Sequence, residues 1–240
     1  MEWMRLDKFL SLQGIGSRRE VKELLKKGLV IVNDKVEKRP ESKVNPEADT
    51  VVFQGKRISF KQHVYFVLNK PSGCVTATED EKEKTVLDFI TEERHRNLFP
   101  VGRLDKDTEG LLLITDDGEL AHQLLSPKRH VDKVYLAKLE KPVGKEDVEA
   151  FLKGLDIGEK ALTLPAKLEP LPDNQAKVTL HEGKFHQVKR MFEVRNNKVR
   201  KLKRLSMGEI CLEDSLLPGE FRPLTNKELL YVEKCKNGTV

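Results

Sequence analysis

Two carboxylates and an arginine lie close together in a polar stretch near the middle of the chain. Asp105 and Asp107 follow Arg103 and precede residues 111–115, an apolar run with the length of a buried strand. A loop anchored to a rigid strand holds a reacting group well, and a carboxylate there can act as nucleophile, base or electrostatic stabiliser. An isolated Asp-x-Asp pair more often only solvates a loop and forms a salt bridge. A metal site is disfavoured, because no histidine or further carboxylate lies at a suitable spacing.

A second group of candidates lies in residues 184–195, which we expect to form a helix with one apolar face. Lys189 lies about 100° from Val188, at the rim of that face, whereas Arg190 lies about 200° away. Lys189 can therefore reach a partly buried site. Arg190 and His186, four residues apart, should share the outer face and point to solvent or to a polyanion. A lysine at such a rim often only extends its charged end into water.

The net charge of +5 is unevenly distributed along the 240 residues. Residues 1–62 carry 14 basic and 9 acidic side chains and so hold all of it, while residues 63–240 are neutral overall. Within the neutral part, residues 181–205 carry 9 basic side chains against 2 acidic ones. Two basic segments suggest a polyanionic partner, because phosphate neutralisation releases counterions. Solvated surfaces would give the same counts, so charge alone leaves both interpretations open.

Residues 4–57 have the pattern of a small separate unit. A short amphipathic helix is predicted around Leu6–Leu10, and Ser17 with Glu20 has the spacing of a capping box for a second helix that ends near Gly28. Strands over 29–32 and 50–53 follow, and the polar stretch 54–62 is predicted to be a linker. The polar face of the capped helix carries four cations, namely Arg18, Arg19, Lys22 and Lys26.

Residues 63–240 mix strands and helices without a regular βαβ repeat. Strands are predicted over 64–68, 111–115, 134–139, 176–180 and 198–212, and helices over 119–125, 145–155 and 184–195. We therefore expect an α+β fold, with a mixed, mainly antiparallel sheet flanked by helices. No apolar run approaches the roughly 20 residues of a membrane helix. The three cysteines are widely spaced and odd in number, which predicts no disulfide framework and a reducing cytoplasm.

The stretch "RLDKFLSLQGIGSRREVKELLKKGLVIVNDKVEKRPESKV" resembles the alpha-L RNA-binding module of small-subunit ribosomal protein four. The resemblance implies an RNA-binding domain over residues 1–60. Its contacts would come from the four cations of the capped helix. A small interaction domain with no RNA role is the alternative.

Three stretches of the larger part resemble pseudouridine synthases. They are "GRLDKDTEGLLLITDDG" at 102–118, "VYFVLNKPSGCVTAT" at 64–78 and "KVYLAKL" at 133–139. The resemblance implies a pseudouridine synthase domain over residues 63–240, with Asp105 as the catalytic residue. It also implies that Tyr135 stacks on the base, that Lys189 pairs with the aspartate and that Leu202 lies under the target base. Asp107 falls at a variable place in the motif and is assigned no role.

The stretch "GKFHQVKRMF" at 183–192 resembles the RsuA branch of these enzymes, which acts on small-subunit rRNA. Large-subunit relatives usually have Arg-Glu in place of His186-Gln187. The resemblance implies that the partner is 16S rRNA or a small-subunit assembly intermediate and that the target is uridine 516. It also implies a monomeric cytoplasmic enzyme.

Pseudouridine formation exchanges a C–N bond between ribose and uracil for a C–C bond. The reaction involves no redox change, so the resemblance implies no cofactor and no metal. Asp105 could act as nucleophile, base or stabiliser, and the sequence does not choose among these roles. A uridine in a stem must be flipped out to react, and Arg103 could fill the gap or hold a flanking phosphate. His186 and Arg190 are expected to bind RNA.

Three alternatives remain. A large-subunit (23S) rRNA synthase would share the catalytic motifs. A non-catalytic RNA-binding protein of ribosome assembly would share both basic segments. A glycosidase-like hydrolase would need a second positioned carboxylate, for which Asp107 is the nearby candidate.

Overall fold

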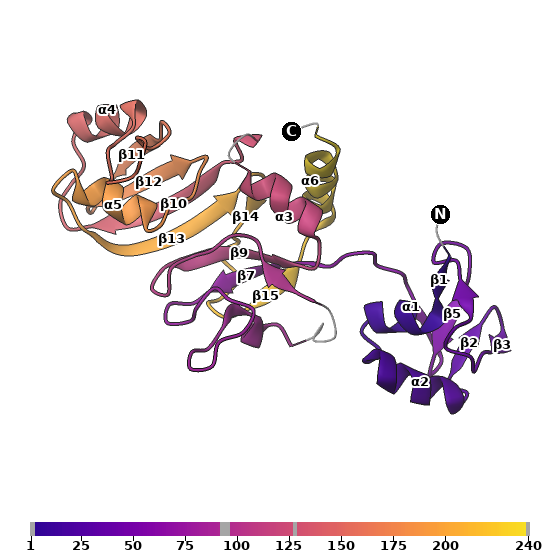
Figure 1. Cartoon of the computed structure of the whole chain (residues 1–240). Helices are drawn as coiled ribbons and strands as arrows, with labels where there is room; N and C mark the ends of the chain where they lie inside the picture. The colour runs from indigo at the N-terminus through magenta and orange to yellow at the C-terminus, as the bar shows by residue number, and fades with distance from the viewer. Residues whose placement is uncertain (1–2, 92–96, 127–128, 239–240) are drawn as a thin grey trace. The chain divides into compact units, whose positions relative to one another are not determined.

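A computed structural model of the chain describes residues 3–91, 97–126 and 129–238. The chain divides into two compact units, each of which appears in Figure 1. Of the described residues, the smaller unit comprises 3–64, 90–91 and 97–98, and the larger unit comprises 65–89, 99–126 and 129–238. None of the helices in the described ranges is long and apolar enough to cross a membrane.

The smaller unit combines two helices with short strands. Its elements are β1 (Met4–Arg5), α1 (Leu6–Leu12), α2 (Arg18–Lys26), β2 (Val30–Val32), β3 (Lys35–Val36), β4 (Lys43–Val44), β5 (Val51–Phe53) and β6 (Lys56–Ile58). Strands β3-β2-β5-β6 form one sheet, and β1 pairs with β4. The capping box predicted for α2 is present, because the Ser17 hydroxyl accepts from the Glu20 amide and the Glu20 carboxylate accepts from the Ser17 amide. The unit has its own core, formed by Leu6, Phe9, Leu10, Val21, Leu25, Val30, Val44 and Val51.

The prediction of a polar linker over 54–62 is wrong. Gln54 and Gly55 both have positive φ and form the turn of a β5–β6 hairpin. Phe60 then stacks on Phe9 with ring centroids 5.7 Å apart, and the Gln13 side chain exchanges two hydrogen bonds with the Lys61 backbone. This segment therefore belongs to the core and sheet of the smaller unit, because Ile58 and Phe60 bury apolar surface that the polar composition obscured.

The larger unit is built on a nine-stranded sheet with the order β11-β12-β10-β13-β9-β7-β15, to which β14 and β8 add at β13 and β9. Every pairing is antiparallel except β9 with β13. The predicted α+β class with a mainly antiparallel sheet is therefore confirmed. The strands are β7 (Tyr65–Lys70), β8 (Phe99–Pro100), β9 (Glu109–Thr115), β10 (Lys133–Leu139), β11 (Lys167–Leu171), β12 (Gln175–Leu180), β13 (Val199–Met207), β14 (Ile210–Cys211) and β15 (Phe221–Pro223).

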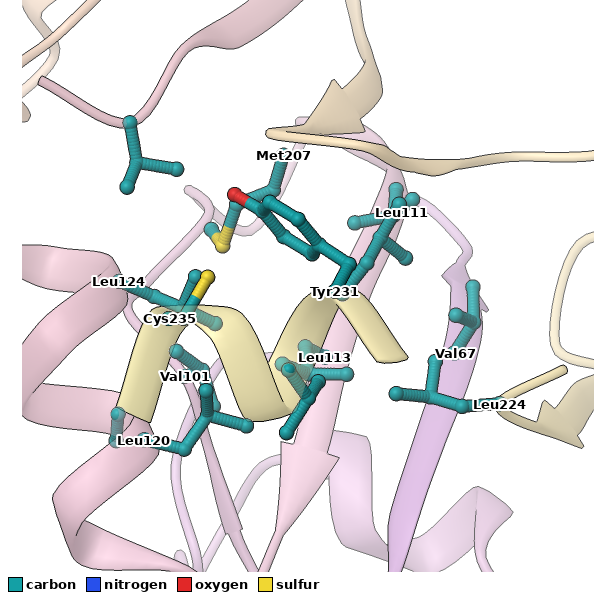
Figure 2. Packing of buried hydrophobic residues seen from close by; sticks show 14 residues of the cluster. Val67, Val101, Leu111, Leu113, Leu120, Leu124, Met207, Leu224, Tyr231 and Cys235 are labelled. Carbon is teal, nitrogen blue, oxygen red and sulfur yellow. The ribbon is translucent and has the colours of Figure 1, made fainter. Parts of the chain in front are cut away.

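The helices of the larger unit flank this sheet. They are a 3-10 turn at Val86–Phe89, α3 (Gly118–Leu125), α4 (Lys145–Lys153), α5 (Gln187–Glu193) and α6 (Asn226–Asn237). Helices α3 and α6 pack on each other and on the strands β7 and β9. Figure 2 shows this core, to which α3 contributes Leu120 and Leu124, α6 contributes Cys235, and β7 and β9 contribute Val67 and Leu113. At the other end, Phe151 of α4 packs on Phe192 of α5 with ring centroids 5.0 Å apart.

The parallel contact between β9 and β13 requires a glycine. Gly110 pairs with Arg204, and a Cβ atom at position 110 would lie 2.3 Å from the Arg204 carbonyl oxygen. Gly110 also has a φ of 102°, which side-chain-bearing residues rarely adopt. This close approach brings β13 beside the strand that follows the Asp105 loop.

Two helices differ from the sequence prediction. α5 begins at Gln187 instead of Lys184, because His186 adopts a left-handed conformation with a φ of 48°. α6 was not predicted, although Thr225 and Glu228 form a capping box at its start. Strands β11 and β15 were also missed, and both lie towards the edges of the sheet.

Candidate active site

A cleft of about 640 Å³ lies in the larger unit, over one face of the sheet. Tyr135 of β10 pairs with Arg204 of β13, and Leu202 lies two residues further along the same strand. Alternation along β10 puts Lys133 on the same face as Tyr135. All four side chains line the cleft and are less than a tenth exposed. Most of the remaining lining comes from residues 102–106 with Thr108 and from residues 182–188, at and before the start of α5.

Side chains of β7 and of the residues after it bind the backbone of the loop that carries Asp105. The fully buried Lys70 donates from Nζ to the backbone carbonyls of Pro71, Lys106 and Thr108 at 3.1, 3.2 and 2.9 Å. The Thr76 hydroxyl donates to the Leu104 carbonyl at 2.7 Å and accepts from the Leu104 amide at 3.2 Å. These bonds fix the backbone on both sides of Asp105, so the carboxylate is presented on a rigid support.

Asp105 and Lys189 form an ion pair at the cleft. Lys189 Nζ lies 2.9 Å from Asp105 Oδ2 and 2.6 Å from Asp107 Oδ1. The Asp105 side chain is 25% exposed and that of Asp107 is 71% exposed, so Asp107 lies on the solvent side of the same ammonium. Burial alone would lower the pKa of Lys189, but its hydrogen bonds to both carboxylates outweigh burial and raise it. The bond from Lys189 also lowers the pKa of Asp107.

His186 and Phe185 form the rim of the cleft. His186 Nε2 lies 3.5 Å from Asp105 Oδ1, because the left-handed backbone at His186 turns its side chain towards the aspartate. The predicted outer-face position of His186 is therefore wrong. The Phe185 ring stacks on the His186 ring at 3.8 Å and is 74% exposed, so an aromatic surface faces solvent at the mouth of the cleft.

Arg190 does not point outwards as the helical wheel predicted. Its guanidinium bonds to the Glu159 carboxylate at 2.7 Å, to the Phe185 carbonyl at 3.0 Å and to the Ile157 carbonyl. These contacts tie the start of α5 to the segment before β11. The wheel was wrong here because it assumed a solvent-facing surface where another loop packs.

The other predicted residues divide between the cleft and the smaller unit. Tyr135 and Leu202 line the cleft floor, 8% and 6% exposed, and the exposed Arg103 lies at its edge. Arg18, Arg19, Lys22 and Lys26 are all exposed on α2, and Lys26 pairs with Glu23 at 2.9 Å.

Four residues of the cleft and its support were not singled out from the sequence. Lys70 and Thr76 lie inside the stretch that resembles the first pseudouridine synthase motif, and that position was an available signal. Lys133 and Arg204 lie on the cleft floor. Lys133 begins the stretch at 133–139 that resembles these enzymes, so the same signal was available for it, whereas Arg204 was hidden among the nine cations of residues 181–205. No group of three or more His, Cys, Asp or Glu side chains in the described ranges could hold a metal ion.

Residues 64–194, which carry most of this cleft, match the RNA pseudouridylate synthase family, and residues 4–51 match the S4 domain family. The chain belongs to the RNA pseudouridine synthases. The family match covers Asp105, Tyr135 and Lys189, while Leu202 and Arg204 lie beyond its end.

Whole-chain comparisons agree with this assignment. The synthase is 45% identical over 231 residues to an uncharacterized RNA pseudouridine synthase, YtzG, of Bacillus subtilis (strain 168), with 94% of this chain and 97% of the relative covered. It is 43% identical over 232 residues to ribosomal small subunit pseudouridine synthase A of Escherichia coli (strain K12), with 95% and 100% covered. A crystal structure of a pseudouridylate synthase superposes with a TM-score of 0.67 at 38% identity and covers 97% of this chain and 99% of that one. The resemblance to the RsuA type is thereby confirmed.

Proposed function

We propose that this enzyme isomerises uridine 516 of 16S rRNA to pseudouridine and that Asp105 is its catalytic carboxylate. The observation that carries the catalytic assignment is the position of Asp105, at the mouth of a cleft floored by Tyr135 and Leu202 and paired with Lys189 at 2.9 Å. Binding alone would not need a carboxylate there, because RNA presents phosphates. The small-subunit target is supported by relatives named ribosomal small subunit pseudouridine synthase A.

The reaction requires a carboxylate near the ribose and a flat surface for the base. The C1′–N1 bond breaks, the uracil turns, C5 bonds to C1′, the C5 proton leaves and N1 gains a proton. Asp105 faces the reacting sugar in this proposal, whether as nucleophile, base or stabiliser. Lys189 balances the charge of the Asp105–Asp107 pair, and the Tyr135 ring stacks on the uracil.

The target uridine must leave its stack to reach the cleft, at a cost of a few kcal/mol. Arg103 at the cleft edge would hold a flanking phosphate or fill the gap, and His186 and Phe185 would contact the RNA at the rim. Arg18, Arg19, Lys22 and Lys26 on the smaller unit would add phosphate contacts. Arg190 is left out of this RNA surface, because its guanidinium is already bonded within the larger unit.

The decisive experiment maps pseudouridine by carbodiimide modification and primer extension in rRNA from cells that lack this protein. We expect one stop to disappear, at position 516 of 16S rRNA, and to return with the wild-type protein but not with Asp105→Asn. Asp107→Asn is the matched control and should restore the stop.

A missing stop in 23S rRNA would instead establish a large-subunit enzyme. An unchanged pattern would favour a non-catalytic role in ribosome assembly. Equal failure of both variants would favour a two-carboxylate mechanism.

A further inference from the structure

The cleft contains buried polar atoms that have no hydrogen-bond partner among the described residues. Arg204 is 2% exposed, and its Nε donates to the Leu111 carbonyl at 2.8 Å, whereas its buried Nη2 has no hydrogen-bond partner in the described residues. The buried Thr108 hydroxyl, which also lines the cleft, has none among the described residues either. Buried polar groups in native proteins are nearly always hydrogen-bonded, so two exceptions in one cleft point to a polar ligand.

A second buried cation lies beside Arg204. Lys133 is 5% exposed, and its Nζ has one partner among the described residues, the Val131 carbonyl at 3.2 Å. An ammonium has three donors, so Lys133 can still give hydrogen bonds into the cleft. Burial and the charge of Arg204 both lower the pKa of Lys133, which indicates that the two cations lie close enough to repel each other. The charge of Asp132 acts in the opposite direction and raises the pKa of Lys133, but Asp132 also pairs with His181 at 2.9 Å, and the pKa of Lys133 stays lowered, so the two buried cations are compensated only in part.

We propose that Lys133 and Arg204 bind the carbonyl oxygens of the target uracil and distinguish it from cytosine. The side chains of lysine and arginine donate hydrogen bonds and cannot accept them. This end of the cleft therefore favours a base edge that offers hydrogen-bond acceptors. Uracil presents O2 and O4, whereas cytosine has an amino group, a donor, in place of O4. The Thr108 hydroxyl can accept from the N3–H of uracil between them.

The same pair would also act during the reaction. When the C1′–N1 bond breaks, its electron pair stays with the base, and the negative charge is delocalised onto O2 and O4 until the base bonds again. Two fixed, buried cations stabilise such a charge without reorganisation. The inference rests on the proposed role of Asp105, because the ribose must lie at Asp105 for the uracil to reach the cleft floor.

The first test needs no knowledge of the target RNA. Binding of UMP and of CMP to the full chain is measured by calorimetric titration for wild type, Lys133→Met and Arg204→Gln. We expect wild type to prefer UMP by about 10- to 100-fold, the size of one or two lost charged hydrogen bonds, and both variants to lose most of this preference. Lys138→Met is the matched control, because Lys138 lies on the same strand but is exposed and bonds to the Asp173 carbonyl away from the cleft. Equal binding of UMP and CMP by wild type, or binding of neither, would overturn the inference.

The second test weakens one hydrogen-bond acceptor of the target base at a time. Single-turnover rates are compared for 16S-derived RNA with uridine, 2-thiouridine or 4-thiouridine at the target, since sulfur is a weaker acceptor. We expect thio substitution to slow wild type, and to slow Lys133→Met or Arg204→Gln by a smaller factor because the bond is already lost. If thio substitution slowed the folded variants and the wild type by the same factor, the inference would be refuted. If wild type converts no uridine in this RNA, the proposed target has failed, and the nucleotide-binding test decides the inference alone.

Discussion

Replacing Lys133 with methionine should make the protein more stable. The ammonium is buried with one carbonyl partner among the described residues, and burial together with the nearby Arg204 lowers the pKa of Lys133 from 10.5 to about 8. One pKa unit corresponds to about 1.4 kcal/mol, so keeping this lysine charged in the folded protein at pH 7 costs about 3 kcal/mol. Methionine has a similar length and no charge, so it removes most of this cost.

The gain should depend on pH in a defined window. The lysine of the unfolded chain titrates near 10.5 and that of the folded chain near 8. Between these values the unfolded state binds more protons, so the free energy of unfolding of wild type rises with pH. Below pH 8 both states are protonated and the cost is present in full. The difference between Lys133→Met and wild type should therefore be about 3 kcal/mol at pH 7 and should close between pH 8 and 10.5.

Scanning calorimetry of the full chain at pH 7 and at pH 9.5 measures this difference in the transition of the larger unit. Lys70→Met is the contrasting variant, because Lys70 is equally buried but bonds to three carbonyls. Its loss strands those acceptors and should lower stability. If Lys133→Met proved less stable than wild type, or if its gain were the same at both pH values, the reasoning about an undercompensated buried charge would be refuted.

Three further predictions concern the rim, the ion pair and the smaller unit. Lys189→Met should lower the single-turnover rate strongly and Lys189→Arg partly, because only the second keeps a cation beside Asp105; equal rates in both would exclude charge balance as the role of Lys189. Phe185→Ala should raise the Kd for target RNA by about 5- to 150-fold if its exposed ring stacks on a base, with Leu152→Ala, an exposed apolar residue on α4, as control. Replacing Arg18, Arg19 and Lys22 together by glutamine should flatten the dependence of log Kd on log salt by about 2 to 3, and an unchanged slope in a binding titration would show that α2 does not touch phosphates.

Local rules predicted those parts of the fold whose causes are local. The capping box at Ser17 and Glu20 predicted the start of α2, and alternating or continuous apolar runs predicted the central strands. The same capping rule, applied to Thr225 and Glu228, would have predicted α6, so that miss was avoidable. The start of α5 was not predictable in this way. His186 adopts a left-handed conformation that local propensity disfavours and that the surrounding contacts must stabilise.

The residues of the candidate site also differ in whether local sequence signals could predict them. The place of Lys189 on a helix rim predicted that it reaches a partly buried site, and the resemblance to the family implied that it pairs with Asp105. Lys133 and Arg204 become neighbours only through strand register. A bulge beside Val134 and Tyr135 sets which residues of β13 face the cleft, and the parallel pairing at Gly110 buries Arg204 against β9. In the sequence Arg204 is one of nine cations in residues 181–205. Lys201 and Lys203 lie on the same strand, but both alternate with Arg204 to the other face and are more exposed than Arg204. What separates a buried cation from a solvated one here is a register shift of one residue, which charge counts and periodicity cannot resolve. A buried donor without a hydrogen-bond partner among the described residues, Arg204 Nη2, is therefore the observation behind the role that we propose for this pair and that the composition of a basic RNA-binding protein conceals.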